Sequence, residues 1–224
     1  MINSLFSRFR EETEAGVLVE SLVVMSVLIL TLGAFVELTL VVFQWNLATK
    51  ALQVGSRLAS ISNPVDASIH NFDPVSAGFD PGDKLPIGTM GTRTCTAKVK
   101  PNGNVQGTCT AGVFDEAAMR RLVFGGDYDS NPTCGAPYVG QTGMCDVLPR
   151  IVDSENPATI IVRYGDGGLG YAGRVDGGIP VVSITLANLR FDFLMLNSLL
   201  GSLEVSFPSF AVSSVGEDLN ETHI

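Results

Sequence analysis

The stretch Gly16–Phe43 reads GVLVESLVVMSVLILTLGAFVELTLVVF and contains only two charged residues, Glu20 and Glu37. As a helix rising about 1.5 Å per residue it measures roughly 40 Å, which is enough to cross a bilayer core of about 30 Å. A cleaved secretory signal fits poorly, because the run exceeds an h-region of about 7–15 residues and no small-x-small site ends it. Apolar residues continue with partly helical spacing through residues 44–63. We therefore predict one long helix over residues 16–62, half in a membrane and half outside.

The composition limits the classes of function that the chain can serve. Its 224 residues suffice for one medium domain, or for a small domain plus a membrane segment. The 14 Lys+Arg residues are scattered along the chain against 23 Asp+Glu, giving a formal charge of −9, which argues against binding of nucleic acid. The mean hydropathy is +0.30 and only 17% of residues are charged, which excludes disorder of the whole chain.

The four cysteines predict disulfide bonds and an oxidising compartment. All four lie between residues 95 and 145, no C-x-x-C knuckle is present, and both His residues are far away, so disulfides are favoured over a zinc site. The charges flanking the apolar helix leave its orientation open. A disulfide-bearing domain that follows the helix must lie outside the cytoplasm, and residues 1–15 are then expected inside.

One of the three pairings that four cysteines allow is favoured by a predicted hairpin. Residues 93–99 and 104–110 read as strands around Pro101-Asn102-Gly103, in which Gly supplies the left-handed position of a three-residue loop. In this register Cys95 faces Cys109. A bridge closing a loop of about 15 residues contributes roughly 3 kcal/mol in the chain-entropy model. Cys134 and Cys145 are left to pair around a Gly/Pro-rich loop.

The rest of the chain predicts a small domain after the helix. Pro and Gly become frequent after the helix, which predicts a connector over 63–84, followed by an outer domain over 85–212 and a loose acidic tail over 213–224. A short helix is predicted at 115–123. Alternation of apolar and polar residues predicts strands at 158–164 and 180–193. The predicted fold class is α+β, with a long N-terminal transmembrane helix extended into a small, mainly antiparallel β-sheet domain.

The glycine-rich residues 165–170, GDGGLG, satisfy the nucleotide-binding pattern G-x-G-x-x-G after a predicted strand. The following residues 171–180 contain three more Gly and a Pro, so they cannot open the helix that would hold a pyrophosphate. We expect a flexible hairpin connection there. No hydrolase motif is present, and we expect no enzymatic activity and no cofactor.

A weak calcium candidate lies at Asp127, Asp129 and Asn131, which place oxygen donors at alternate residues. Pro132 then stands where a calcium loop needs Gly, and Tyr138 stands where its bidentate Glu belongs. A solvated acidic loop is the favoured interpretation. No other metal site is expected.

Glu20 calls for an explanation, because an unpaired carboxylate near the apolar region costs on the order of 2–3 kcal/mol. It lies either at the headgroup level or beside a cation in the membrane plane, such as the α-amino group of another subunit. For Glu37, near the opposite end of the span, a simple interfacial position explains the residue as well as a specific role does.

The residues around Glu20 resemble the N-terminal signal of a bacterial pilin family. A hydrophilic leader, SRFREETE at 7–14, precedes Ala15-Gly16-Val17-Leu18-Val19-Glu20 and the apolar helix. This arrangement is similar to the class III signal of Flp/Tad pilins, and specifically of TadE-like pseudopilins, which carry Glu at the fifth mature position. The resemblance implies cleavage between Ala15 and Gly16. The family usually has Gly before the cut, and a cut after Gly16 would leave Glu20 fourth.

The resemblance extends weakly beyond the signal. Glu37 looks like the family's second acidic position, and residues 51–59 (ALQVGSRLA) are similar to its helix extension. Residues 181–193 and 208–218 are similar in style to TadE-like tails, whereas residues 64–157 match no family.

The resemblance implies a pilin-like fold and a role in Tad (Flp-type) pilus assembly. A prepilin peptidase would remove the leader, and Glu20 would pair with the new N-terminal amine of an adjacent subunit. The expected partners are the peptidase, other Tad pilins and the inner-membrane assembly platform. The expected location is the bacterial inner membrane with the C-terminal domain in the periplasm, or an extracellular pilus. Small residues suit helix association in lipid: Ser21, Ser26, Gly33 and Ala34.

The alternative function is a single-pass, uncleaved periplasmic binding module, in which the helix is only an anchor. This module would be dependent on calcium or another ligand. Cleavage of the leader and dependence on Glu20 discriminate between the two hypotheses.

Overall fold

The computed structural model describes residues 13–127, 134, 142–173, 178–193, 204–206 and 209–216. The chain divides into two compact units. The first unit comprises Met1–Phe43 and Asp192–Glu204, and the second comprises Gln44–Phe191 and Val205–Ile224. Helix α2 (Thr13–Ile61) is continuous, and it contributes its first part to the first unit and its last turns to the second. The second unit therefore begins inside the helix and includes the predicted connector 63–84, whereas the outer domain was predicted to begin at residue 85.

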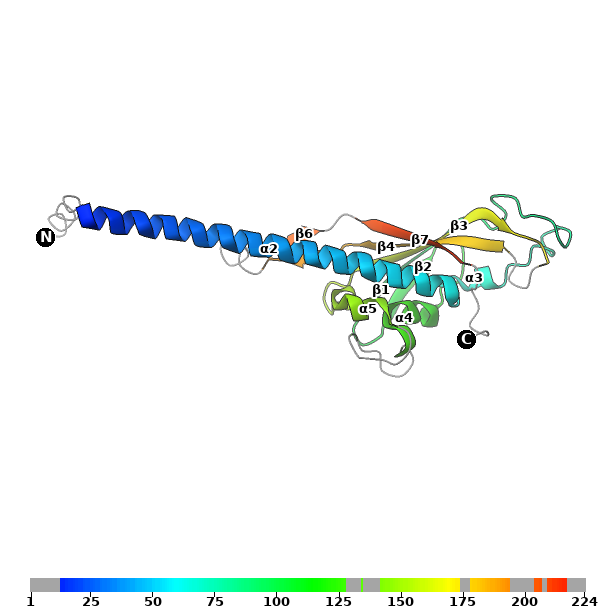
Figure 1. Cartoon of the computed structure of the whole chain (residues 1–224). Helices are drawn as coiled ribbons and strands as arrows, with labels where there is room; N and C mark the ends of the chain where they lie inside the picture. The colour runs from blue at the N-terminus through cyan, green and yellow to red at the C-terminus, as the bar shows by residue number, and fades with distance from the viewer. Residues whose placement is uncertain are drawn as a thin grey trace. The chain divides into compact units, whose positions relative to one another are not determined.

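The second unit is built on a five-stranded antiparallel sheet (Figure 1). The strand order is β2-β1-β3-β4-β7, and the strands are β1 (Arg93–Val99), β2 (Val105–Cys109), β3 (Thr159–Gly170), β4 (Gly178–Ala187) and β7 (Phe210–Val215). A separate two-stranded sheet pairs β5 (Arg190–Asp192) with β6 (Glu204–Ser206). The predicted α+β class with an N-terminal helix is confirmed.

One face of the five-stranded sheet is apolar and the other is polar. Across one row, Cys95 of β1 lies opposite Cys109 and Val162, and Val162 lies opposite Ile184 of β4. Cys95, Val162 and Ile184 in this row are buried and Cys109 is half-buried, whereas alternate residues such as Thr96 and Arg163 are exposed. The alternation is that of an antiparallel sheet with one covered face and one solvated face.

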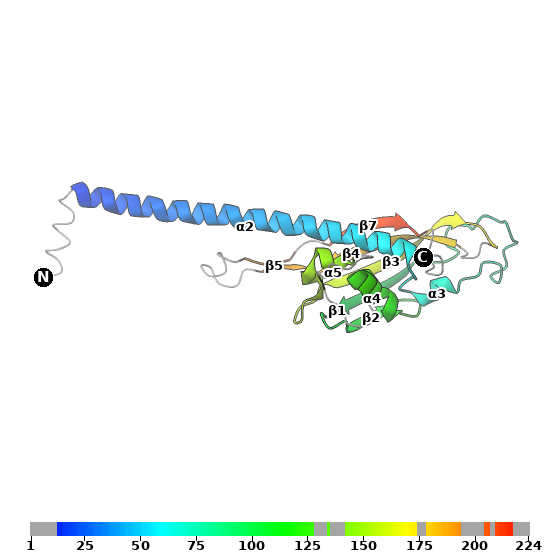
Figure 2. The ribbon, with the colours of Figure 1, turned by 60° about the horizontal axis from the view of Figure 1, so that its bottom comes forward.

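Helices cover the apolar face (Figures 1 and 2). They are the last turns of α2, α4 (Glu116–Phe124) and α5 (Met144–Val147). Ser214 of β7 donates a hydrogen bond of 2.9 Å to the carbonyl of Ser56 in α2, which ties the helix to an edge strand. A Cβ on Gly55 would lie 2.5 Å from the sulfur of Met144, so α5 packs directly on the backbone of α2. In this segment the exposed side chains form a polar stripe: Asn46, Lys50, Gln53 and Arg57.

Shorter elements complete the second unit. They are α3 (Ala67–His70) and the 3₁₀ helices η1 (Gly125–Asp127) and η2 (Pro149–Val152). Helix α4 begins where the acidic first turn predicts it, because the Asp115 carboxylate accepts a hydrogen bond of 3.1 Å from the Ala118 N–H. Gly125 ends it with a φ of 69°.

Three details differ from the sequence-based expectations. The glycine-rich residues 165–170 are the second half of β3, not a flexible connection, and β3 absorbs them by a shift of register between Asp166 and Leu169. The predicted strand 180–193 is interrupted after β4 at Asn188, whose φ is 58°. The expected tail begins later than residue 213, because β7 continues to Val215 and pairs with Val181.

Candidate functional site

The first part of α2 has the surface of a membrane-spanning segment. Its apolar side chains are exposed on every side of the helix over residues 17–32 and on most of it up to Phe43, with exposed fractions that include 70% for Leu18, 54% for Ile29 and 57% for Phe43. By length and composition, α2 is the one described helix that could cross a membrane: the candidate segment is Gly16–Ile61, and an 18-residue window within it has a mean hydropathy of 2.3. The helix is therefore compatible with anchoring in a membrane.

The Ser and Thr hydroxyls within this part of α2 make their hydrogen bonds inside the helix. The hydroxyls of Ser21, Ser26 and Thr31 each donate to the carbonyl three residues earlier, at 2.8–2.9 Å. Thr39 donates to the carbonyl of Phe35 at 2.8 Å. Because these hydroxyls need no partner from outside, the helix can meet lipid or another apolar helix at Ser21 and Ser26 without a desolvation penalty for them.

The residues expected to direct processing and assembly lie at different levels of exposure. Ala15 and Gly16, the expected cleavage site, fall within α2, which begins at Thr13, and no atom outside the helix lies within 4 Å of a Cβ built on Gly16. Glu20 is exposed. Glu37, by contrast, is buried within the chain, with an exposed fraction of 1%. The structure thus leaves Glu20 accessible to an external cation and encloses Glu37.

The calcium candidate falls mostly outside the described residues. Asp127 is the last residue of η1, whereas Asp129 and Asn131 lie outside the described ranges. This site carries no structural argument for a bound ion.

Two disulfide bonds join the four cysteines, and the described residues contain no free cysteine. One links Cys95 of β1 to Cys109 of β2 in the register that the hairpin predicts. The other links Cys134 to Cys145 of α5. The first bridge ties the edge strand of the sheet to its neighbour, and the second ties the segment after η1 to a helix packed on α2.

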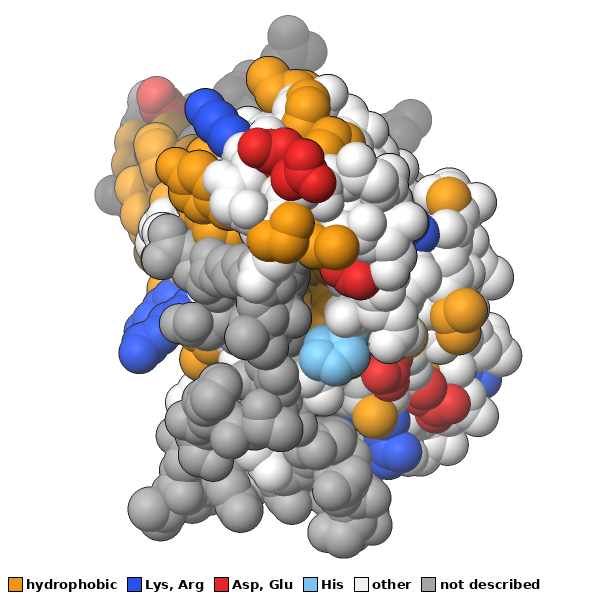
Figure 3. All heavy atoms as spheres, turned by 90° about the vertical axis from the view of Figure 1, so that its right-hand side faces the viewer, with side chains coloured by type: hydrophobic (Ala, Val, Ile, Leu, Met, Phe, Trp, Pro, Cys, Tyr) orange, Lys and Arg blue, Asp and Glu red, His pale blue; other side chains and the backbone are white. Residues whose placement is uncertain are grey.

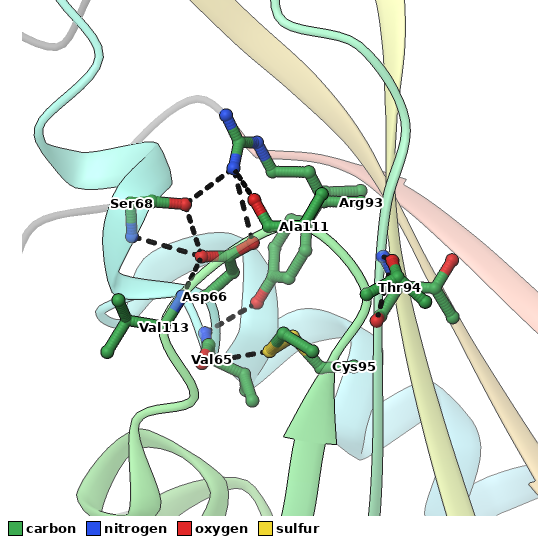
Figure 4. The surroundings of a disulfide bond; sticks show 11 residues. Val65, Asp66, Ser68, Arg93, Thr94, Cys95, Ala111 and Val113 are labelled. Carbon is green, nitrogen blue, oxygen red and sulfur yellow. Dashed lines mark hydrogen bonds and ion pairs between the residues drawn. A yellow bond between two sulfur atoms is a disulfide. The ribbon is translucent and has the colours of Figure 1, made fainter.

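A buried carboxylate, Asp66, lies beside the first bridge (Figure 4). Asp66 has no exposed side-chain surface and caps α3, because its Oδ1 accepts hydrogen bonds from Ser68 N at 3.0 Å, from Ser68 Oγ, and from Val113 N at 3.2 Å. Its Oδ2 forms an ion pair of 3.7 Å with Nη1 of Arg93. The same nitrogen donates to Ser68 Oγ and to the carbonyl of Ala111, both at 2.6 Å.

The Asp66 cluster consists of Asp66, Ser68, Arg93, Ala111 and Val113. It joins three segments that are distant in the sequence: the segment after α2, strand β1 and the loop after β2. A Cβ on Gly112 would overlap the Asp66 carboxylate, so this loop approaches closely only because residue 112 has no side chain. The amino-acid sequence alone did not lead us to predict this cluster. The signal that was available was local, since Asp66 precedes Ala67-Ser68 as a helix-capping residue does.

Tyr164 of β3 is a further buried residue beside Asp66, and it contacts the preceding residue, Val65. Its hydroxyl oxygen accepts a hydrogen bond of 2.8 Å from the Val65 N–H, and Tyr164 is buried with an exposed fraction of 2%. Burial raises the pKa of the Tyr164 phenol well above its ordinary value; the hydrogen bond from Val65 opposes this rise, and the nearby negative charges of Asp66 and Asp115 add to it.

The raised pKa of Tyr164 predicts a loss of stability at alkaline pH. In the folded chain the phenol keeps its proton, whereas in the unfolded chain it ionises above a pH of about 10. The free energy of unfolding should therefore be unaffected by this group below pH 10 and should fall above it by about 1.4 kcal/mol per pH unit. Chemical denaturation of the full chain in detergent micelles, compared with Tyr164→Phe, measures this slope.

The Tyr164→Phe chain should lack the alkaline slope but should be less stable at neutral pH by about 1–3 kcal/mol, because the buried Val65 N–H loses its acceptor. If the alkaline slope is the same in both chains, Tyr164 does not cause it.

An open groove of about 520 Å³ lies over β1, β2 and the start of β3, and offers little for catalysis. Lys98 is the one charged side chain among its lining residues, which are otherwise Thr96, Ala97, Val105, Gln106, Gly107, Thr108 and Thr159. A groove without Asp, Glu, His or Cys has no acid–base pair and no nucleophile activated by a neighbouring base. On the face drawn in Figure 3, Lys and Arg side chains are dispersed among acidic and polar groups.

Comparison with known proteins gives no relative: no family model, no curated protein and no solved structure matches the chain.

Proposed function

We propose that the chain is a TadE-like minor pilin or pseudopilin, which acts in the assembly of a Tad (Flp-type) pilus after a prepilin peptidase removes its leader. The observation that carries the proposal is the change in environment along one continuous helix. Residues 17–32 of α2 expose apolar side chains on all sides, and residues 48–59 bury theirs against a disulfide-linked antiparallel sheet. A subunit of this construction can leave a membrane and pack its apolar segment against other helices while its folded domain stays intact.

Glu20 supports assembly rather than simple anchoring. It is an exposed carboxylate four residues after Gly16, among apolar side chains that are more than half exposed. In hydrocarbon a carboxylate at this position needs a cation, and the new α-amino group of a neighbouring cleaved subunit provides one at the same depth. The disulfides support an outer domain in an oxidising compartment, with the inner membrane as the site of anchoring.

Cleavage tests the proposal most directly. The full chain is expressed with and without a Tad-class prepilin peptidase, and the intact mass of the membrane-extracted protein is measured. We expect loss of residues 1–15 only when the peptidase is present, and loss of residues 1–16 would move the cut by one bond. A chain that keeps its full mass both with and without the peptidase would contradict the pilin proposal and would favour the alternative function, an uncleaved membrane-anchored binding module.

Substitution of Glu20 tests the assembly step. In Glu20→Ala we expect recovery of the protein in the sheared pilus fraction to fall by at least about tenfold, the equivalent of about 1.4 kcal/mol. Insertion into the membrane should improve, because a carboxylate is removed, so the fall cannot arise from failed anchoring. Ser21→Ala is the matched control, since the Ser21 hydroxyl bonds only within the helix. Equal recovery of Glu20→Ala and Ser21→Ala would contradict the assigned role.

A further inference from the structure

The surroundings of the Cys95–Cys109 bridge contain a second set of ligands for a metal ion. The two Sγ atoms and a carboxylate oxygen of Asp66 all lie within 4.8 Å of one another (Figure 4). Cys95 and Asp66 have no exposed surface, and Cys109 is half-buried. In the disulfide-bonded chain the sulfur atoms are not metal ligands, because only thiolates bind a metal strongly.

The Asp66 carboxylate is only half satisfied by the protein. Oδ1 accepts hydrogen bonds from Ser68 and Val113, whereas Oδ2 is buried and accepts none from the described residues. Nη1 of Arg93 lies 3.7 Å from this oxygen, which is longer than a hydrogen bond. A buried oxygen left in this way calls for an explanation, and an ion is one of the usual ones. A disulfide beside it has no proton to donate, so the oxidised bridge cannot supply the missing partner.

We propose that the reduced chain binds one Zn²⁺ ion through the thiolates of Cys95 and Cys109 and Oδ2 of Asp66, with water at the fourth position. Two sulfur ligands and one carboxylate suit Zn²⁺ better than Ca²⁺ or Mg²⁺, which prefer oxygen ligands alone. The three ligands carry three negative charges, and Zn²⁺ together with the Arg93 guanidinium balances them within a buried site. The half-buried Cys109 gives solvent a route to the open position.

Cys95 and Cys109 can form the disulfide or bind the metal ion, but they cannot do both at once. A dithiol reductant breaks the S–S bond, giving two Cys thiols and the oxidised reductant. Binding of Zn²⁺ then releases the two thiol protons. A newly synthesised chain has reduced cysteines before its outer domain reaches an oxidising compartment. In that interval the ion would hold β1 and β2 in the register that the bridge later makes permanent.

Cobalt absorption provides the test, because thiolate-to-Co²⁺ charge-transfer bands report sulfur ligation directly. The full chain in detergent micelles carries Cys134→Ser and Cys145→Ser, so that Cys95 and Cys109 are its only thiols, and it is reduced and titrated with Co²⁺. We expect charge-transfer bands that saturate at one ion per chain and disappear on addition of Zn²⁺. Adding Asp66→Asn to this background should weaken Co²⁺ binding by at least about tenfold.

Two results would overturn the proposal. One is the absence of charge-transfer absorption in the reduced background chain. The other is a binding curve that Asp66→Asn leaves unchanged, which would mean that the two thiolates bind cobalt without the folded site. The second result remains decisive if reduction unfolds the chain, because Asp66 of the segment after α2 is close to the thiols of the hairpin only when the second unit is folded.

Discussion

Replacing Asp66 by alanine should destabilise the second unit by about 3 kcal/mol, one of the two largest effects expected from a single substitution in this chain. The substitution leaves the N–H groups of Ser68 and Val113 without their acceptor and leaves Arg93 without its carboxylate. Breaking a buried ion pair from one side costs about 3–5 kcal/mol, and the lower end applies because the Arg93 side chain keeps 21% of its surface exposed. Chemical denaturation of the full chain in detergent micelles, with the disulfides intact, measures the loss.

Asp73→Ala is the matched control for Asp66→Ala. Asp73 makes the same kinds of local hydrogen bond, from Val75 N at 3.0 Å and from Ser76 Oγ at 2.6 Å, but it is exposed to solvent. Its loss should be much smaller, because water replaces the missing acceptor. Equal losses for the two substitutions would show that capping, and not burial of the charge pair, accounts for the effect of Asp66.

The hairpin was predictable because its signals are local. Pro101-Asn102-Gly103 contains a residue that tolerates a left-handed backbone, and Gly103 has a φ of 76°. The turn sets the register, and the register places Cys95 opposite Cys109. Local signals also predicted α4 to within one residue, because the acidic residues Asp115 and Glu116 favour the first turn of a helix.

The point at which α2 changes from exposed to packed was not predictable. Every residue from Val17 to Leu30 except Glu20, Ser21 and Ser26 is apolar, so no periodicity distinguishes a lipid-facing side from a core-facing side. The sequence indicates an exposed side and a packed side of the helix only after this segment, where the charged residues Lys50 and Arg57 lie on the exposed side. The end of the membrane-like segment thus depends on where the sheet begins to cover the helix, which is a tertiary property.

The Asp66 cluster and the continuation of β3 were missed for a related reason. Asp66 and Val113 are 47 residues apart, and their contact requires the loop after β2 to close over α3. The glycines of residues 165–170 disfavour a strand locally. Pairing of Leu169 with Ile179 and of Gly170 with Gly178 overrides that preference. In both places a contact between distant segments decides the structure.

The second large effect is expected at Gly143, immediately before α5. Gly143 has a φ of −86°, which any residue can adopt, so a substitution here tests space alone. A Cβ on Gly143 would lie 2.5 Å from the backbone atoms Gly125 N and Phe124 C, and it would also overlap the carbonyl oxygen of Val123. These are backbone atoms at the end of α4, which cannot move aside as a flexible side chain would.

Gly143→Ala should therefore lower the free energy of unfolding by about 3 kcal/mol, the upper end of the usual cost of overpacking. The displacement would also strain the hydrogen bond of 2.8 Å from Gly143 N to the Asp146 carboxylate, and it would separate α5 from α4. Gly165→Ala is the control, since its Cβ would meet only the carbonyl oxygen of Val181 at 3.6 Å and should change stability by less than about 1 kcal/mol. Denaturation curves of the two chains that coincide would show that the contact between α4 and residue 143 is looser than the structure places it.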